Sequence, residues 1–573
     1  MRTEGADDDP GQLTWRGAEQ LPASVAAALM GPGAPFELVT ETMLGRQLQV
    51  FAQRPRSLRA VFDATVARQP DAIFMVDADR SWTFAEAIAD VDAVGRVLVE
   101  RYGVGTGDRV GIVAANSPEY GLAMWAALSI GAVVAGLNGW WTGHELHYGI
   151  ELAAPKVILG DEPRLARLAP DAIPDGVPVV TLEAIYAQAR AVGNGGRSWT
   201  AEVDEDDPMV ILFTSGTTGR PKGATLSHRN LIHFAWANML TGAIGAMTSG
   251  APRPVTPTQP VSIMASPMFH VSGMVGILMT GGILGAKLVF PPPGRWEVTR
   301  HFELTQAHRV TTWSGVPTQF WRLLRDPDFD RYDVSSVLNA GGGGAPFPPE
   351  LVREFLLRMP WVTLGNGYGM SETAGMGTRT GGPLMVEHPE SVGGVNPTLE
   401  LEIRDEQGRV LPVGDVGEIY LRSASVFLGY WNDPAATAAC LDAAGWYRTG
   451  DFGRVDKGML YLASRIRDLI IRGGENIYPT EIEHRLVEHP DIHDAAVIGV
   501  DHHELGQEVK AFVIRRDGAN LTAADVQSWA SETLARFKVP AHVEFRSTLP
   551  YTETGKVLKH QLETEERART STL

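Results

Sequence analysis

Short apolar runs alternate with segments of helical periodicity through the first half of the chain. Helical spacing begins after Ser57, and Thr83-Phe84-Ala85-Glu86 has the form of a capping box at the start of a second helix. Apolar runs of three to five residues predict buried strands at 110–114, 133–137, 157–159 and 209–213. Strands that alternate with helices over short connections are typical of parallel βαβ units. We therefore predict an α/β fold with parallel strands.

The pattern changes after about residue 395. Segments 399–403 and 417–421 alternate apolar and polar residues, which predicts an antiparallel β unit that ends near residue 466. From residue 467 onward, strands at 495–500 and 509–514 and a helix near 521–536 predict a smaller α+β domain of about 107 residues. Residues 1–56 are mixed, with scattered glycine and proline, and form a loosely assigned N-terminal extension.

Two uncharged stretches require a test for membrane insertion. Residues 121–137 and 271–286 number 17 and 16, fewer than the roughly 18 that a spanning helix needs. Each predicts a buried helix that leads into a buried strand. The N-terminus has no apolar segment after a basic start, so no secretory signal is expected. We expect a cytoplasmic protein without stable membrane insertion.

Composition excludes several classes of partner and of site. Lys and Arg number 50 against 68 Asp and Glu, and the formal charge of −18 argues against a nucleic-acid partner and against docking on anionic lipid. The one cysteine, Cys440, excludes an intramolecular disulfide and a cysteine-based zinc cage. Glycine reaches 62 of 573 residues, an excess that requires places where the backbone turns sharply or approaches a ligand.

One such place follows the apolar run 209–213. Residues 213–223 read Phe-Thr-Ser-Gly-Thr-Thr-Gly-Arg-Pro-Lys-Gly. Its hydroxyls, backbone amides and lysine can surround a polyphosphate. It is not a Walker A loop, because Lys222 is followed by Gly223. A flexible surface loop is the alternative.

Further clusters have matching chemistry. The four glycines of 341–344 leave room for a flat ring, and Tyr368 can stack on a base. Glu372 can hold Mg²⁺, which prefers oxygen ligands. Asp451, expected at a strand end, can accept hydrogen bonds from two ribose hydroxyls. A structural role stays open for each cluster taken alone.

Taken in order, segments 214–223, 368–372, 447–451, 473–479 and 554–556 resemble the signatures of the AMP-forming acyl-CoA synthetases. Their superfamily also contains firefly luciferase and the adenylation domains of peptide synthetases. The resemblance covers roughly Ser57 to His560. It implies a large N-terminal domain of two stacked α/β sheets plus a β-barrel-like unit at about 395–466. A small mobile C-terminal domain follows, giving domains 57–466 and 467–573.

The resemblance also implies a reaction and its residues. A carboxylate attacks the α-phosphate of Mg-ATP, and the thiol of CoA then takes the acyl group, so ATP, Mg²⁺ and CoA are the expected cofactors and co-substrates. Lys556 and Glu372 are the implied catalytic residues, with Glu372 the Mg²⁺ ligand, Gly473 and Gly474 the CoA tunnel and Arg467 the hinge. The implied ATP-binding residues are Thr214, Ser215, Gly216, Thr217, Thr218, Gly219, Lys222, Gly342, Gly343, Gly344, Asn366, Tyr368, Gly369, Ser371, Asp451 and Arg465.

The acyl substrate is predicted to be a hydrophobic carboxylic acid, medium- or long-chain fatty or bulky and ring-bearing. In the resembled family, the position of His270 lies beside the acyl group. The other candidate pocket residues are Trp236, Val271, Gly315, Val316 and Thr318. A ligase that loads a free-standing carrier protein, an aryl or short-chain acid–CoA ligase, and a homodimeric assembly stay open.

The chain departs from the family pattern at several positions. Ser371 replaces a commoner threonine but keeps the hydroxyl, and Ser464 replaces the usual glycine before Arg465. Arg467 stands where aspartate or lysine is usual. Asn138-Gly139 replaces the usual Asn-Pro, and the paired Trp140-Trp141 that follow have no account from sequence. Histidine pairs 144/147 and 502/503 have no carboxylate or cysteine partners in the sequence pattern, so we expect surface or capping roles for them.

Overall fold

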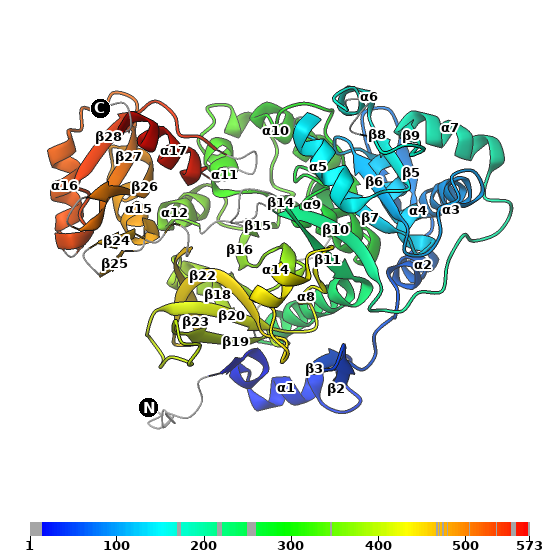
Figure 1. Ribbon diagram of the computed structural model, residues 1–573, viewed down its shortest axis with the longest axis horizontal. Helices are drawn as coiled ribbons and strands as arrows, with labels where there is room; N and C mark the ends of the chain where they lie inside the picture. The colour runs from blue at the N-terminus through cyan, green and yellow to red at the C-terminus, as the bar shows by residue number, and fades with distance from the viewer. Residues whose placement is uncertain are drawn as a thin grey trace.

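The computed structural model describes residues 14–141, 143–168, 173–214, 221–248, 259–343, 347–465, 468, 470–472, 475–477, 479–502, 505–534, 536–551 and 557–570. Two sheets and their helices form the larger part of the molecule, and the C-terminal segment forms a smaller body at one side (Figure 1). This is the predicted fold class, a large α/β domain followed by a small domain.

A seven-stranded sheet contains the parallel strands predicted from the short apolar runs. Strands β10, β7, β6, β8 and β9 are parallel, while β11 pairs antiparallel with both β10 and β21. In spatial order the strands are β21 (Gly429–Tyr430), β11 (Lys222–Ser227), β10 (Pro208–Thr214), β7 (Val133–Gly136), β6 (Arg109–Val113), β8 (Val157–Gly160) and β9 (Val179–Thr181).

A second sheet has fourteen strands among the described residues. Its centre, from β4 to β16, is parallel apart from the edge strand β5, and the remaining strands are antiparallel. The antiparallel unit predicted at 399–462 is continuous with this parallel centre through β17 and β18. The spatial order is β1 (Trp15–Arg16), β19 (Glu400–Arg404), β20 (Gly417–Arg422), β22 (Tyr447–Asp456), β23 (Met459–Arg465), β18 (Gly393–Val395), β17 (Thr378–Gly381), β16 (Thr363–Tyr368), β15 (Asn339–Gly343), β14 (Thr312–Ser314), β12 (Val261–Ile263), β13 (Lys287–Val289), β4 (Ile73–Val76) and β5 (Ser81–Thr83).

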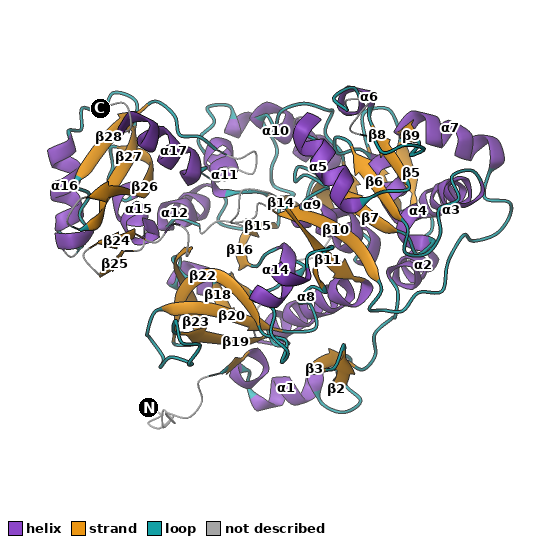
Figure 2. Cartoon of the chain, viewed as in Figure 1, coloured by secondary structure: helices purple, strands orange, loops and turns teal. Residues whose placement is uncertain are grey.

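Helices pack around the two sheets (Figure 2). The predicted capping box is confirmed, because Thr83 with Glu86 forms both of its bonds. Ser57 and Ser117 also cap helices, by accepting bonds from backbone amides of the first turns. The α-helices before the C-terminal segment are α1 (Ala23–Met30), α2 (Leu58–Arg68), α3 (Phe84–Glu100), α4 (Pro118–Ser129), α5 (Gly143–Ala153), α6 (Glu162–Leu165), α7 (Leu182–Val192), α8 (His228–Thr248), α9 (Val271–Val275), α10 (Val298–His308), α11 (Pro317–Leu324), α12 (Pro349–Arg358), α13 (Pro383–Glu387) and α14 (Pro434–Cys440).

Both uncharged stretches are core elements. The first is α4 followed by β7, and Trp125 of α4 stacks on Phe62 with ring centroids 4.4 Å apart. The second begins with α9, continues as a π-helix over Gly276–Ile283 and leads into β13. Gly282 permits this close packing, because an added Cβ would lie 2.2 Å from the Trp125 ring. Within the described part of the chain, no helix is long and apolar enough to cross a bilayer.

The C-terminal segment folds around a five-stranded sheet of its own. Its strands are β24 (Ile470–Arg472), β25 (Glu475–Ile477), β26 (Ile492–His502), β27 (Gly506–Arg515) and β28 (His542–Arg546), covered by α15 (Pro479–Val487), α16 (Ala523–Ser531) and α17 (Lys559–Thr570). The predicted strands are confirmed. The helix predicted near 521–536 was too long, because α16 ends at Ser531 and a separate 3₁₀ turn follows at Arg536–Lys538.

The N-terminal segment is part of the large body. Strand β1 extends the fourteen-stranded sheet, α1 packs into its core, and the hairpin of β2 (Leu38–Met43) and β3 (Arg46–Phe51) follows. A buried charge cluster fixes this segment. Glu205 accepts two bonds from Arg54, at 2.9 and 2.7 Å, and its Oε1 lies 2.8 Å from Nη2 of Arg229 in α8.

We predict that Glu205→Ala lowers the free energy of unfolding by about 3 kcal/mol, because it removes the buried carboxylate that Arg54 and Arg229 share and leaves them only their more exposed partners, Glu41 and Asp206. The glutamate side chain is only 6% exposed, so water cannot replace it. A reduced urea midpoint of the large domain is the expected signal. Glu303→Ala, in an exposed pair with Arg300, is the control and should stay within about 0.5 kcal/mol of the parent. Equal effects of the two substitutions would contradict the prediction.

Candidate active site

The predicted phosphate loop lies between two paired strands. β10 ends at Thr214 and β11 begins at Lys222, and these two residues are partners in the antiparallel register. The hairpin therefore holds both ends of the loop at the edge of the buried seven-stranded sheet. Gly223 is required by packing, because an added Cβ would lie 2.7 Å from Cγ2 of Ile211. The predicted residues Ser215, Gly216, Thr217, Thr218 and Gly219 lie outside the described residues.

A buried carboxylate, Glu372, faces this hairpin. It lies in a 3₁₀ turn, Ser371–Thr373, that follows β16 of the other sheet, and it is 7% exposed. The hydroxyl of Tyr430 in β21 donates to Oε1 of Glu372 at 2.8 Å. The ammonium of Lys222 lies 5.0 Å from the centre of the Tyr430 ring, within cation–π range. The structure therefore brings two predicted residues into contact with one tyrosine: Glu372 at its hydroxyl and Lys222 over its ring.

Tyr430 was missed by the sequence analysis. It is 58 residues from Glu372 along the chain, and no spacing rule connects a Gly-Tyr pair to a distant glutamate. Burial, reinforced by the charge of Glu372, raises the pKa of Tyr430 and of Tyr447 above their usual value. Both phenols therefore stay protonated near neutral pH, and Tyr430 remains a hydrogen-bond donor to the carboxylate.

Two further predicted residues meet directly. The hydroxyl of Tyr368 at the end of β16 donates to Oδ2 of Asp451 at 2.9 Å, and each of the two residues is 7% exposed. The expected position of Asp451 at a strand end was wrong: β22 runs from Tyr447 to Asp456 and continues beyond it. In the register of β22 and β23, Asp451 is the partner of Arg465. Tyr368, Asp451 and the Arg465 backbone thus lie together, although their sequence separation is large.

The predicted glycine cluster forms a strand. Residues 339–343 are β15, and glycine is required there by the neighbouring strands. An added Cβ at Gly341 would lie 1.9 Å from the Gly365 carbonyl oxygen, and one at Gly342 would lie 2.1 Å from the Gly315 carbonyl oxygen. Gly369 has the same constraint, 2.2 Å from the Gly375 oxygen. Asn366 is 4% exposed in the adjacent strand β16, and Gly344 lies outside the described residues.

The acyl-pocket candidates come from three elements. His270 is the residue before α9, which starts at Val271. A Cβ built on Gly375 would contact both Val271 and Phe234 of α8, at 3.7 and 3.8 Å, so α8 and α9 meet at this glycine. Trp236, also in α8, is partly buried against the core. Gly315 and Val316 immediately precede α11, whose Thr318 has a side chain outside the described part of the structure.

The structure explains the paired tryptophans Trp140 and Trp141 by their packing. Trp141 packs edge-on against Phe213, the residue before Thr214, with ring centroids 5.2 Å apart. Gly149 leaves room for it, because a Cβ there would lie 2.5 Å from the Trp141 ring. Trp140 is 41% exposed and lies edge-on, 4.8 Å away, against Phe269 beside His270. Trp141 thus packs against the β10–β11 hairpin, and Trp140 lies beside the acyl-pocket candidates.

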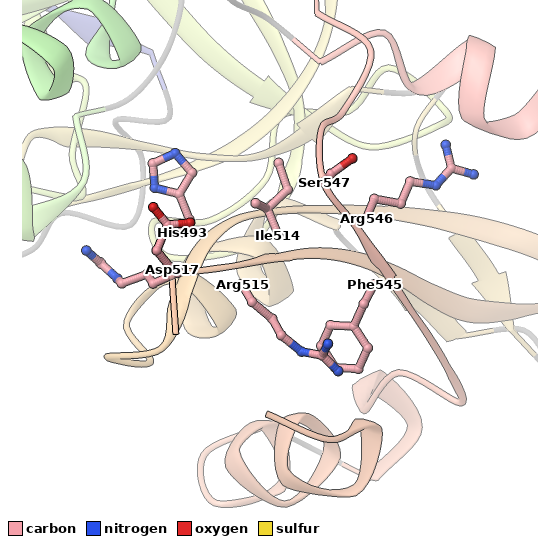
Figure 3. Close-up of a pocket in the computed structure, with 8 residues that line it drawn as sticks. His493, Ile514, Arg515, Asp517, Phe545, Arg546 and Ser547 are labelled. Atoms are coloured by element: carbon pink, nitrogen blue, oxygen red, sulfur yellow. The ribbon is translucent and has the colours of Figure 1, made fainter. Parts of the chain in front are cut away.

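Three groups of predicted residues lie outside the described residues. They are the hinge Arg467, the tunnel glycines Gly473 and Gly474, and the catalytic Lys556. A pocket of about 650 Å³ in the C-terminal segment is lined by His493, Ile514 and Asp517 together with arginines of β27 and β28 (Figure 3). It contains none of the predicted site residues. Among the described residues, no group of three or more His, Cys, Asp or Glu side chains could hold a metal ion by itself.

Comparison with known proteins places this geometry in a family. A family model described as AMP-binding enzyme matches residues 62–431, more than half of the chain, and one described as AMP-binding enzyme C-terminal domain matches 481–556. The chain belongs to the AMP-binding enzyme family. This finding, with acyl-CoA ligases among the relatives, confirms the prediction of an AMP-forming acyl-CoA synthetase, a ligase of the adenylate-forming superfamily.

Relatives of this synthetase extend over most of its length. It is 31% identical over 538 residues to the medium-chain acyl-CoA ligase ACSF2, mitochondrial, of Danio rerio, covering 87% of this chain and 86% of that protein. It is 29% identical over 546 residues to a long-chain-fatty-acid–CoA ligase of Bacillus subtilis (strain 168), covering 89% and 95%. The crystal structure of ATP-bound MatB from Rhodopseudomonas palustris superposes with a TM-score of 0.78 at 30% identity, covering 89% and 99%.

The single cysteine provides a test of the site's electrostatics. Burial, followed by the charge of Glu372, raises the pKa of the Cys440 thiol from 9.0 to about 11. The thiolate population at pH 8 should therefore be about 100-fold below that of an unperturbed thiol. We predict slow alkylation by iodoacetamide at pH 8, with a rate that rises steeply toward pH 11, measured by intact mass.

Glu372→Gln is the matched variant for this measurement. It removes the negative charge beside Cys440 and leaves a side chain of nearly the same shape, so alkylation at pH 8 should become faster. A parent protein that alkylates at the rate of a free thiol, or a variant that reacts at the parent's rate, would show that the burial and charge around Cys440 are misassigned.

Proposed function

We propose that this synthetase converts a hydrophobic carboxylic acid, medium- or long-chain fatty or ring-bearing, to its CoA thioester. The acid's carboxylate oxygen bonds to the α-phosphorus of ATP while the bond to pyrophosphate breaks. The thiolate sulfur of CoA then bonds to the acyl carbon, and AMP leaves. The observation that carries the proposal is that Glu372 and Lys222 both contact Tyr430 at the β10–β11 hairpin. The hairpin lies within the part of the chain that matches the AMP-binding enzyme family.

The residues at the hairpin fit Mg²⁺ and ATP. Mg²⁺ is usually held in nucleotide sites by one or two carboxylates together with substrate phosphates, so a lone buried Glu372 is a suitable protein ligand. When bound, the ion neutralises charge on the phosphates. Lys222 supplies a second positive charge from the first residue of β11, and Tyr430 holds Glu372 in a fixed position through its hydroxyl. Thr214 at the end of β10 offers a hydroxyl at the start of the phosphate loop.

The paired Tyr368 and Asp451 fit the nucleoside part of ATP. In this proposal Asp451 accepts bonds from the ribose hydroxyls and Tyr368 packs beside the adenine, with Asn366 and the glycines of β15 close by. The Tyr368 hydroxyl already donates to Asp451, which fixes both side chains before ATP binds. Such preorganisation lowers the ordering cost of binding. Ser371, one residue before Glu372, is assigned to the α-phosphate.

Apolar surroundings support a hydrophobic acid. Val271, Phe234 and Trp236 are partly buried beside the core, and Trp140 and Phe269 lie next to His270. The names of two relatives, a medium-chain acyl-CoA ligase and a long-chain-fatty-acid–CoA ligase, point to the same substrate class. We further propose domain boundaries at 57–466 and 467–573, with Arg467 as the hinge between two half-reactions.

A pyrophosphate-release assay over a panel of acids tests the proposal. With ATP, Mg²⁺ and CoA we expect steady turnover and one acyl-CoA formed for each pyrophosphate released. Without CoA we expect a single turnover that stops at the bound adenylate. Steady turnover that needs a carrier protein in place of CoA would overturn the CoA-ligase proposal in favour of carrier loading.

Lys556 is proposed to bridge the attacking carboxylate and the α-phosphate, where two anions must approach each other. We predict that Lys556→Ala loses at least about 100-fold in adenylate formation, within the range found when one such group is removed, yet still transfers supplied acyl-adenylate to CoA. Pyrophosphate release and acyl-CoA formation are measured separately. Lys559→Ala, which removes a nearby lysine paired with Glu483, is the matched control. Equal losses in both half-reactions would contradict this role for Lys556.

A further inference from the structure

Toward the carboxyl ends of β15 and β16, one face of the large sheet presents five glycines and a single arginine. In register across β15, β16 and β17, one row contains Gly343, Gly367 and Arg379, and the next contains Gly341, Gly365 and Gly381. Side chains alternate along a strand, so these six residues share one face, which we call the glycine face. Asn366, Tyr368, Thr378 and Thr380 occupy the opposite face and are buried.

The glycine face is open where a sheet interior is normally covered. Its five glycines are half-buried or exposed, and Arg379 is exposed. A Cβ built on Gly365 or Gly367 would meet only backbone oxygens of neighbouring strands, at 3.6 Å and beyond. No described side chain therefore lies within 4 Å of a Cβ at these two positions in the middle of the face. Glycine inside a strand commonly marks the close approach of a ligand, and this face presents two rows of it.

Arg379 connects the glycine face to the acyl-pocket candidates. Its Nη1 donates to Oδ1 of Asn238 in α8 at 3.1 Å, and Nδ2 of Asn238 donates to the Phe234 carbonyl one turn earlier at 2.8 Å. Phe234 in turn lies beside Gly375, where Val271 of α9 also approaches. Arg379 is thus at the far end of a chain of contacts that begins at His270 and Val271.

The charge of Arg379 has no described counter-charge. No carboxylate among the described residues forms an ion pair with it, whereas the buried arginines 54, 59 and 229 each have carboxylate partners. Burial lowers the pKa of Arg379, although the side chain is solvent-accessible. A guanidinium that protein atoms surround but that solvent still reaches has both a lowered pKa and an exposed side chain. A cation placed there at a desolvation cost is stabilised when a ligand supplies an anion.

We propose that Arg379 binds a second carboxylate at the far end of the acyl substrate, so that this synthetase acts on dicarboxylic acids with an apolar spacer. One carboxylate is adenylated beside Glu372, the spacer lies between the glycine face and α8, and the other carboxylate pairs with the guanidinium. Planar carboxylate suits the two-pronged geometry of arginine, and Asn238 keeps that geometry in place. This inference rests on the proposed function and deepens it.

The test compares three substrates of equal chain length: a monocarboxylic acid, the corresponding α,ω-dicarboxylic acid, and the monomethyl ester of that diacid. For the parent enzyme we expect kcat/KM for acyl-CoA formation to be about 10- to 100-fold higher for the diacid than for its ester, mostly through KM. Arg379→Met should remove this ratio by lowering kcat/KM for the diacid to the value for its ester. Arg300→Met, on the exposed face of α10, is the control and should keep the parent's ratio.

The substrate comparison on the parent enzyme needs no variant, so a misfolded Arg379→Met does not remove the test. Arg379→Lys keeps the positive charge but loses the two-pronged guanidinium, so it should keep part of the preference for the diacid over its ester. A parent enzyme that uses the monocarboxylic acid as well as the diacid overturns this inference and leaves the ligase proposal intact. Failure to form acyl-CoA from any acid of the three overturns the proposed function itself.

Discussion

The hydrogen bond from Tyr430 to Glu372 joins the two sheets of the large domain. Glu372 follows β16 of the fourteen-stranded sheet, and Tyr430 belongs to β21 at the edge of the seven-stranded one. The backbone carbonyl of Glu372 adds a second bond, from the Phe427 amide, at 2.8 Å. A carboxylate buried at this seam would be costly without donors, so the seam and the charge stabilise each other. This junction helps to set the position of the β10–β11 hairpin relative to Tyr368 and Asp451.

Close backbone approach is the second constraint on the site. Between β14, β15 and β16, several glycines cannot be replaced without displacing a neighbouring strand. Glycines of β15, β16 and β17 also leave part of one face of this sheet with Arg379 as its nearest side chain. The glycines of these strands therefore permit both close strand packing and an open patch on one face. They account for part of the glycine excess in the sequence.

Local signals predicted the elements well and the contacts between them poorly. The capping box at Thr83 depends on residues three apart, and it is present. Tyr430 to Glu372 and Tyr368 to Asp451 span 58 and 83 residues, and only the folded sheets bring them together. The N-terminal hairpin was missed for a local reason. Its turn has positive φ at Leu44 and Gly45, 49° and 80°, and Leu-Gly lacks the asparagine or aspartate that usually marks such a turn.

Strand β1 has a consequence for handling the protein in solution. Trp15 and Arg16 pair with Leu401 and Glu400 of β19, which would otherwise end the fourteen-stranded sheet with unpaired amides and carbonyls. Such an uncovered edge can recruit a strand from another molecule. The two residues of β1, together with the bond from Arg16 Nε to Glu400 at 3.1 Å, occupy part of the β19 edge that another molecule could otherwise pair with. We therefore expect the resistance of the protein to aggregation to depend in part on Trp15 and Arg16, which are not among the candidate active-site residues.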